Sequence, residues 1–142
     1  MFGIFKNKKT DQHYDKLVEY VSVLVQMQFK QSACDDGPSV ASRDLWSLGY
    51  ILGFHDAFCQ NQNISDKNKR IQFIKDSYEI IFRDLEDSFE PVLVSLHMQN
   101  ESTFRSGVIA GGTEAMGLIN GTIPMPLGLA MRIMDINSES ED

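Results

Sequence analysis

Two acidic residues, Asp56 and Glu114, stand at the positions of this chain that are best placed to do chemistry. Each precedes an alanine in a similar short motif, and the spacing of small residues in both motifs predicts a helix. If the two helices cross, the carboxylates would approach each other and raise the pKa of one of them, or share a metal ion. The competing interpretation, which we favour, is that each carboxylate binds an arginine or a water molecule at the rim of the fold.

The histidines and cysteines do not complete a catalytic or metal-binding set. His13, His55 and His97 have no suitable second ligand three or four residues away, and His55 would point about 100° away from the adjacent carboxylate on a helix. Cys34 and Cys59 form no Cys-x-x-Cys motif, and the two aspartates that follow Cys34 disfavour its thiolate. The sequence contains neither a nucleophile elbow nor a phosphate-binding loop. We therefore expect no catalytic residue, no metal and no cofactor, and we favour a protein that is not an enzyme.

Small residues four positions apart form a stripe in each of the two motifs. The first stripe is Gly49, Gly53 and Ala57, and the second is Gly107, Gly111 and Ala115. Glycine inside a helix costs up to about 1 kcal/mol relative to alanine, so repeated glycines on one face indicate that another backbone passes close by. Either the two stripes form a helix-packing contact within the chain, or one of them pairs across the axis of a dimer.

The two motifs are also similar to each other in sequence. Residues 48–58 and 106–116 share the pattern Gly-x-Ile-x-Gly-x-x-acid-Ala-apolar at an offset of 58 residues. The same offset aligns apolar residues of 20–27 with those of 78–85. A duplicated helical hairpin explains both alignments, and the alternative is coincidence, because matches of this length are frequent by chance.

The elements that must position these residues are predicted to be helices. Apolar side chains at three- and four-residue spacing predict five helical segments. They cover residues 11–33, a segment that begins after Ser39 or Ser42 and ends near 62, residues 71–96, a segment from 101 or 102 to about 120, and residues 127–134. The first segment also alternates like a strand, but its length and its lack of turn residues favour a helix. We expect an all-α fold, most simply a four-helix bundle with a short fifth helix at the C-terminal end.

Several residues are expected to begin or end these helices. Gly37 and Pro38 are typical of a helix end, and Ser39 or Ser42 is the expected N-cap of the second helix. Ser65 or Asp66 is the expected N-cap of the third. Pro91 should kink that third helix or divide it into two.

The ends of the chain differ from its middle. Residues 11–134 are expected to form a single helical domain, with a flexible segment over 1–10 and a disordered acidic tail over 135–142. The start of the chain is apolar and is followed by lysines, which indicates either docking on the fold or a weak contact with a membrane surface. The apolar stretch 107–131 is too rich in glycine and proline for an integral membrane segment.

Composition narrows the classes of function. The net charge of −7 argues against binding to nucleic acid, and two cysteines in 142 residues fit a reducing, cytoplasmic location. The last third of the chain is rich in methionine, which indicates either an adaptable core or an apolar groove for a partner: Met98, Met116, Met125, Met131 and Met134.

Our leading hypothesis is a protein that acts by binding another protein and that forms a homodimer. A small acidic inhibitor or immunity-type protein that neutralises a basic partner is one concrete form of it. The alternative is a small-molecule binder or an enzyme with its site between the helices around Asp56 and Glu114. A polar cavity between those helices would favour the alternative, and a dry, close contact would favour the leading hypothesis.

Overall fold

Every regular element of the computed structural model is an α-helix over residues 2–140, so the all-α prediction is confirmed for the part of the backbone that the structure describes. Side chains are described for residues 12–139. Seven helices follow one another within these limits: α1 (Phe2–Gln31), α2 (Gly37–Ser42), α3 (Leu45–Asn61), α4 (Lys67–Ile81), α5 (Glu90–His97), α6 (Ser102–Asn120) and α7 (Gly128–Ser140).

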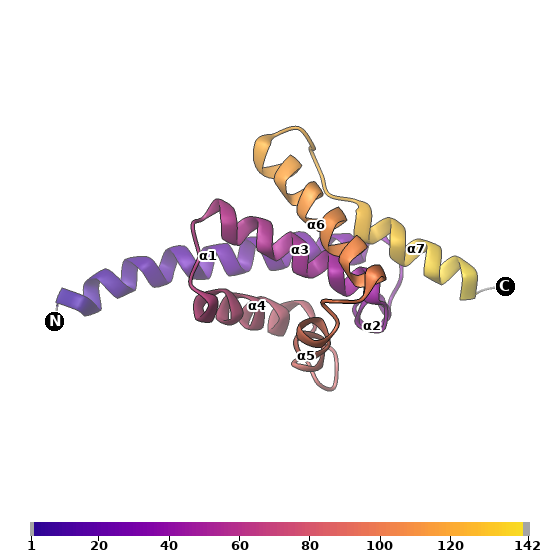
Figure 1. Ribbon diagram of the computed structural model, residues 1–142, viewed down its shortest axis with the longest axis horizontal. Helices are drawn as coiled ribbons and strands as arrows, with labels where there is room; N and C mark the ends of the chain where they lie inside the picture. Colours follow the sequence, from indigo (N-terminus) through magenta and orange to yellow (C-terminus); the bar gives the residue numbers. More distant parts are fainter. Residues whose placement is uncertain (1, 141–142) are drawn as a thin grey trace.

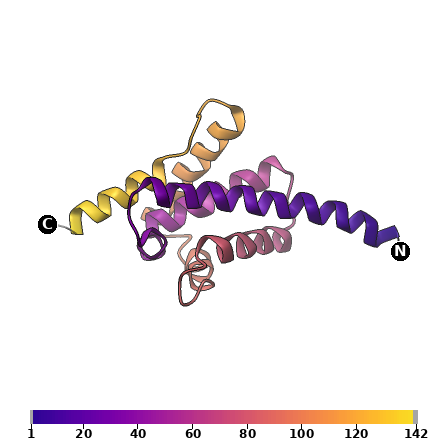
Figure 2. The same ribbon diagram turned by 180° about the vertical axis from the view of Figure 1, so that it is seen from behind.

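Helix α3 is the central element of the molecule. Nine consecutive residues, 47–55, are all buried, which is the pattern of a helix surrounded on every side. Helix α6 crosses one side of α3 (Figure 1), and α1 runs along the opposite side (Figure 2). Helix α1 is long enough that its N-terminal turns extend beyond the other helices in both views, while α7 extends toward the opposite end. The first stripe therefore lies on the central helix, and the second lies on the helix that crosses it.

The expected start of the second helix is wrong. Neither Ser39 nor Ser42 caps α3; its N-cap is Asp44, whose carboxylate accepts a hydrogen bond from the backbone N–H of Ser47. The two serines lie instead within the short helix α2. Proline is compatible with the first turn of a helix, where its missing N–H has no intrahelical acceptor, and so Pro38 helps to begin α2 after α1 has ended.

The segment with helical spacing over residues 71–96 forms two helices, which is one of the two expected outcomes, but the interruption begins earlier than Pro91. Helix α4 begins after its N-cap, Asp66, as predicted, but it ends at Ile81, and residues 82–89 form turns. Pro91 does not kink a continuous helix, because it lies in the first turn of α5. Phe82 remains fully buried in the interruption, which explains why the apolar spacing continues through a stretch that is not helical.

The ends of the later helices agree with the sequence signals more closely. Helix α6 begins at Ser102 and stops at Gly121, which adopts a left-handed conformation with φ of 77°.

Helix α7 begins at Gly128 and continues to Ser140, so residues 135–140 of the expected tail are helical, as are residues 2–10 of the expected flexible segment. Met1 and residues 141–142 lie outside the described residues, as do the side chains of the apolar start. Among the helices of residues 2–140, none combines the length and the apolar run that crossing a bilayer would need.

Candidate functional site

The two stripes of small residues lie against each other within one chain. A Cβ atom added to Gly49 would lie much closer to the carbonyl oxygen of Phe104 than the 3.0 Å that real Cβ atoms keep from other atoms. One added to Gly53 would lie equally close to the carbonyl oxygen of Val108. Ala57 and Ala115, the last members of the stripes, are both buried. At these glycines the contact between α3 and α6 is therefore backbone to backbone, leaves no room for water, and is made without a dimer partner.

The contact is reciprocal. A Cβ atom added to Gly107 would be equally close to the carbonyl oxygen of Trp46, and one added to Gly111 would be equally close to that of Tyr50. Adding 58 to Trp46 and Tyr50 gives 104 and 108, the two carbonyls that face the first stripe. The offset between the two motifs thus also relates their contacts, because each glycine of one helix lies on the matching carbonyl of the other.

The structure does not bring Asp56 and Glu114 into a shared site. Asp56 accepts a hydrogen bond from the guanidinium of Arg70 in α4, with 2.8 Å between Nη2 and Oδ1. Glu114 accepts one from the phenol of Tyr50 at 2.5 Å. The carboxylates have different partners on different elements, so the arginine-bound interpretation holds for Asp56, and Glu114 is used in another way.

Glu114 binds the N-terminus of α7. Its Oε1 atom accepts hydrogen bonds from the backbone N–H groups of Leu127 and Gly128, both at 2.8 Å. Gln28 of α1 completes this cap, since its side-chain oxygen accepts from the N–H groups of Leu129 and Ala130 at 2.9 and 3.1 Å. The four N–H groups that a helix start leaves without intrahelical acceptors are therefore all satisfied by side chains.

Tyr50 links the two halves of this cap. Its hydroxyl accepts a hydrogen bond from the side-chain amide of Gln28 at 3.0 Å while it donates to Glu114. Burial raises the pKa of Tyr50 above its ordinary value, and the hydrogen bond to the Glu114 carboxylate raises it further, so the phenol stays protonated. Sequence reasoning missed Gln28, although one signal was available: a polar residue in register with the apolar face of α1.

A second polar contact lies inside the protein at His55. The ring is fully buried, and its Nδ1–H donates to the carbonyl oxygen of Ile51 at 2.7 Å. This assignment leaves Nε2 to accept from the hydroxyl of Ser77 in α4 at 2.6 Å. Burial lowers the pKa of His55 to about 4, so the neutral ring acts as a fixed connector between α3 and α4.

The remaining candidates for reactive groups are separate. Cys34 and Cys59 are both free thiols. The thiol of Cys34 donates to Asp36, and this hydrogen bond is the main cause that raises the pKa of Cys34, as the neighbouring aspartates predict. Across the residues that the structure describes, no three His, Cys, Asp or Glu side chains lie close enough together to hold a metal ion.

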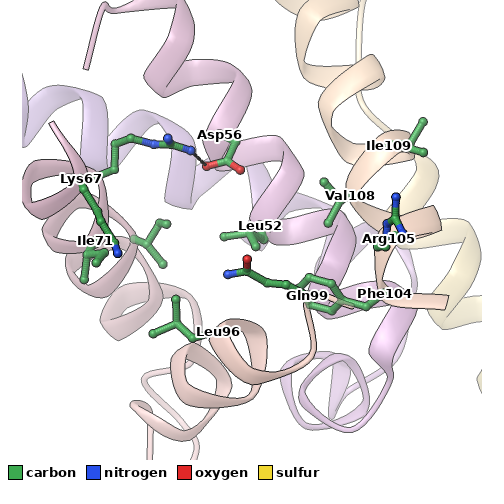
Figure 3. Close-up of a pocket in the computed structure, with 12 residues that line it drawn as sticks. Leu52, Asp56, Lys67, Ile71, Leu96, Gln99, Phe104, Arg105, Val108 and Ile109 are labelled. Carbon is green, nitrogen blue, oxygen red and sulfur yellow. Dashed lines mark hydrogen bonds and ion pairs between the residues drawn. The ribbon is translucent and has the colours of Figure 1, made fainter. Parts of the chain in front are cut away.

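An open groove of about 560 Å³ lies between the α3–α6 pair and the α4–α5 segment (Figure 3). Apolar side chains form most of its walls: Leu52, Ile71, Ile74, Leu96, Phe104, Val108 and Ile109. Ile109 is 70% exposed, although it is a large apolar side chain in the middle of a helix. The groove therefore presents an apolar surface to solvent, which is the type of surface that proteins use to bind partners or apolar ligands.

Polar residues surround this apolar surface. Lys67, Arg70 and Arg105 are the cationic lining residues, and Asp56 is the one carboxylate among them. Because Asp56 pairs with Arg70, the groove keeps two cations without an acidic partner in its lining, although the chain as a whole is acidic. A second hollow follows beyond Asp56 and Ile109, along the diverging C-terminal halves of α3 and α6.

Comparison with known proteins gives no relative: no family model matches this chain, and no curated protein or solved structure is significantly similar to it.

Proposed function

We propose that this protein acts by binding another protein, and that the groove between the α3–α6 pair and the α4–α5 segment receives a helix of the partner. The supporting observation is the exposure of Ile109 within a continuous hollow surface, which a helix can follow from Leu96 to Met116. A helix laid into an apolar groove is a common mode of peptide recognition. The dry contact between the stripes also favours a binding protein over a catalytic cleft between α3 and α6.

The acidic inhibitor remains one form of this proposal, but its basic partner would need another surface, because the groove is cationic. The turn segment between α4 and α5 offers acidic side chains, among them Asp84, Glu86 and Asp87, next to the exposed ring of Phe89. The cytoplasmic location and the absence of enzymatic activity belong to the same proposal.

The alternative is a small-molecule binder or an enzyme around Asp56 and Glu114. One observation favours it, since Asp56 and Arg70 lie in the groove wall as an ion pair that a polar ligand could meet. Glu114 does not line the groove, however, and its Oε1 atom already accepts three hydrogen bonds. A long, open surface also suits a helix better than a compact ligand.

We propose, as part of the same hypothesis, a bundle of four long helices, α1, α3, α4 and α6, derived from a duplicated hairpin. The matched contacts of the two stripes support this origin for α3 and α6. The other pair supports it less, because Tyr20 is 51% exposed in α1 whereas its counterpart Tyr78 is fully buried in α4.

Site-specific crosslinking tests the proposed function. A photoreactive amino acid at position 109 lies in the groove, and one at position 93, which is exposed but outside the groove lining, is its control. After irradiation in the cells that express the protein, we expect a protein adduct from position 109 and none from position 93. Equal adducts at both positions, or no protein adduct at 109, would overturn the proposal.

A matched pair of variants makes the test specific. Leu93 and Leu96 lie one turn apart on α5 and are both 41% exposed, but only Leu96 lines the groove. Leu96→Glu should abolish the adduct at position 109, because it places in the apolar wall a hydrated carboxylate that the partner helix would have to desolvate. Leu93→Glu should leave the adduct unchanged.

A further inference from the structure

We infer that the groove is occupied by the outward face of α7 from a second copy of this chain. This inference rests on the proposed function, since it names the helix that the groove receives. It commits to self-association through two different surfaces, the groove on one copy and α7 on the other.

The outward face of α7 is apolar, and no side chain of residues 12–139 covers it. Leu127, Met131 and Met134 follow one another at spacings of four and three residues, so they line one side of the helix. All three are exposed, and Met131 is 61% exposed. The exposed carboxylates of Asp135 and Glu139 flank this stripe. Helix α7 thus presents the apolar face and the acidic flank of an amphipathic ligand.

The groove is complementary to this face in shape and in charge. It is concave and apolar, with Leu96 and Ile109 exposed on its walls, whereas α7 is convex. Lys67 and Arg105 are cationic lining residues that have no acidic partner within the lining, and α7 supplies Asp135 and Glu139. Lys67 on α4 and Arg105 on α6 line opposite walls (Figure 3), so the acidic flank of α7 meets a cation in either direction of docking, and charge favours the contact without fixing its direction.

The occupant must come from a second copy, because α7 is fixed in its own fold. Its inner face is buried through Leu129, Ala130 and Ile133. Arg132 also binds Asp44, the N-cap of α3, through two hydrogen bonds of 2.9 and 3.0 Å. With the inner face and the N-terminus held, the outward face cannot turn into the groove of the same chain.

The contact joins two different surfaces, so a closed twofold dimer forms only when the α7 of each copy, held in its own fold, lies in the groove of the other copy. A single short helix in one groove buries an area at the small end of the range for protein interfaces. Two such contacts in one dimer double that area. We therefore expect a reversible dimer that weakens at high salt, because exposed ion pairs are screened.

Light scattering after size exclusion, over about a hundredfold range of concentration, provides the test. The mass of the wild-type chain should rise from 16.1 kDa toward twice that value as the concentration increases. Ile109→Glu in the groove and Met131→Glu on α7 should each stay at 16.1 kDa, and Leu93→Glu should behave like the wild type. Circular dichroism and thermal melting check that the variants fold, which the exposure of the substituted side chains favours.

Mixing the two defective variants separates this arrangement from any other dimer. The Ile109→Glu chain keeps an intact α7, and the Met131→Glu chain keeps an intact groove, so an equimolar mixture should regain one of the two contacts and form a 1:1 dimer at a higher concentration than the wild type needs. A dimer through one self-complementary surface would not be restored in this way. A wild-type mass of 16.1 kDa at every concentration, or a mixture that stays monomeric, would overturn the inference.

The two proposals can fail separately. A monomeric wild type that still gives the crosslink from position 109 to a different protein leaves the proposed function in place and removes α7 as the occupant. A restored mixed dimer, together with an adduct from position 109 that joins two copies of this chain, supports both proposals, because the helix in the groove is then α7 of a second copy.

Discussion

Tyr50 donates a hydrogen bond of 2.5 Å to Glu114, and through this contact the central helix α3 is joined to the start of α7. The same carboxylate oxygen accepts from two backbone N–H groups, so its negative charge lies at the positive end of the α7 dipole. The docking of α7 therefore depends on a residue that lies outside α7, in α6.

Replacing Glu114 should loosen α7 before it affects the rest of the fold. Glu114→Ala removes the acceptor of three hydrogen bonds and should cost about 2–4 kcal/mol of unfolding free energy. Glu114→Gln keeps an oxygen acceptor but loses the charge, so its cost should be closer to about 1 kcal/mol. Hydrogen exchange should show faster opening at residues 127–130 in Glu114→Ala, with the amides of α3 less affected. Equal acceleration in both helices would contradict the capping role.

Two adjacent glycines of α6 should respond in opposite directions to the same substitution. A Cβ atom on Gly111 collides with the backbone of Tyr50, whereas one on Gly112 meets only the carbonyl oxygen of Gly53 at an ordinary 3.5 Å. Gly111→Ala should therefore destabilise the protein by several kcal/mol, on the order of a severe overpacking. Gly112→Ala should stabilise it by up to about 1 kcal/mol, because alanine favours the helix. Urea denaturation measures both, and two changes of the same sign would contradict the close contact.

A large side chain in the stripe should be worse than a cavity in the core. Gly53→Leu would force α3 and α6 apart, and we expect the variant to be largely unfolded. Leu48 is also buried, but Leu48→Ala leaves only a cavity and should cost about 2–5 kcal/mol. Thermal melts of both variants settle the order, and a well-folded Gly53→Leu protein would contradict the contact.

Local signals in the sequence were sufficient for most of the helices. Apolar spacing indicated α1, α3, α4 and α6 because each has one side or more in the core, and Gly121 marked the end of α6 because it supplies the left-handed conformation. The interruption after Ile81 was not visible, since Phe82 continues the apolar spacing from within a turn.

The candidate site was harder to predict, because its residues meet only in the folded chain. The glycine spacing indicates a close helix contact by itself, but the identity of the facing backbone depends on the crossing of α3 and α6. Gln28 and Glu114 are separated by 86 positions and share no motif, yet both cap α7. The groove likewise combines side chains from four helices, so it cannot be predicted from the sequence of any one segment.

Removing the end of α7 should have little effect on the stability of the monomer. Ile133 is the last fully buried apolar residue of the chain, and Ser138 and Glu139 are exposed. Deletion of residues 138–142 should therefore shift the melting temperature by no more than about 2 °C. Differential scanning calorimetry at low concentration provides the measurement, and a drop of about 10 °C would show that the tail docks on the fold.

His55 should make the stability depend on pH between about 4 and 6.5. Its pKa is about 4 in the folded chain and near 6.5 when unfolded, so the unfolded chain binds more protons within this window. The stabilisation from the neutral ring is complete above pH 6.5 and is lost as the pH falls toward 4. The loss should approach about 3 kcal/mol, since one pKa unit corresponds to about 1.4 kcal/mol.

A comparison with His55→Gln isolates this effect from the titration of carboxylates. Glutamine cannot titrate, so the variant should be less stable than the wild type at pH 7.5 through the loss of the contacts with Ile51 and Ser77. The gap in unfolding free energy should narrow by about 2–3 kcal/mol between pH 7.5 and pH 4.5, because only the wild type gains a proton on the ring when it unfolds. A gap between wild type and His55→Gln that stays constant with pH would mean that the buried ring binds a proton as readily as the unfolded chain does, in conflict with its burial and with its acceptor role toward Ser77.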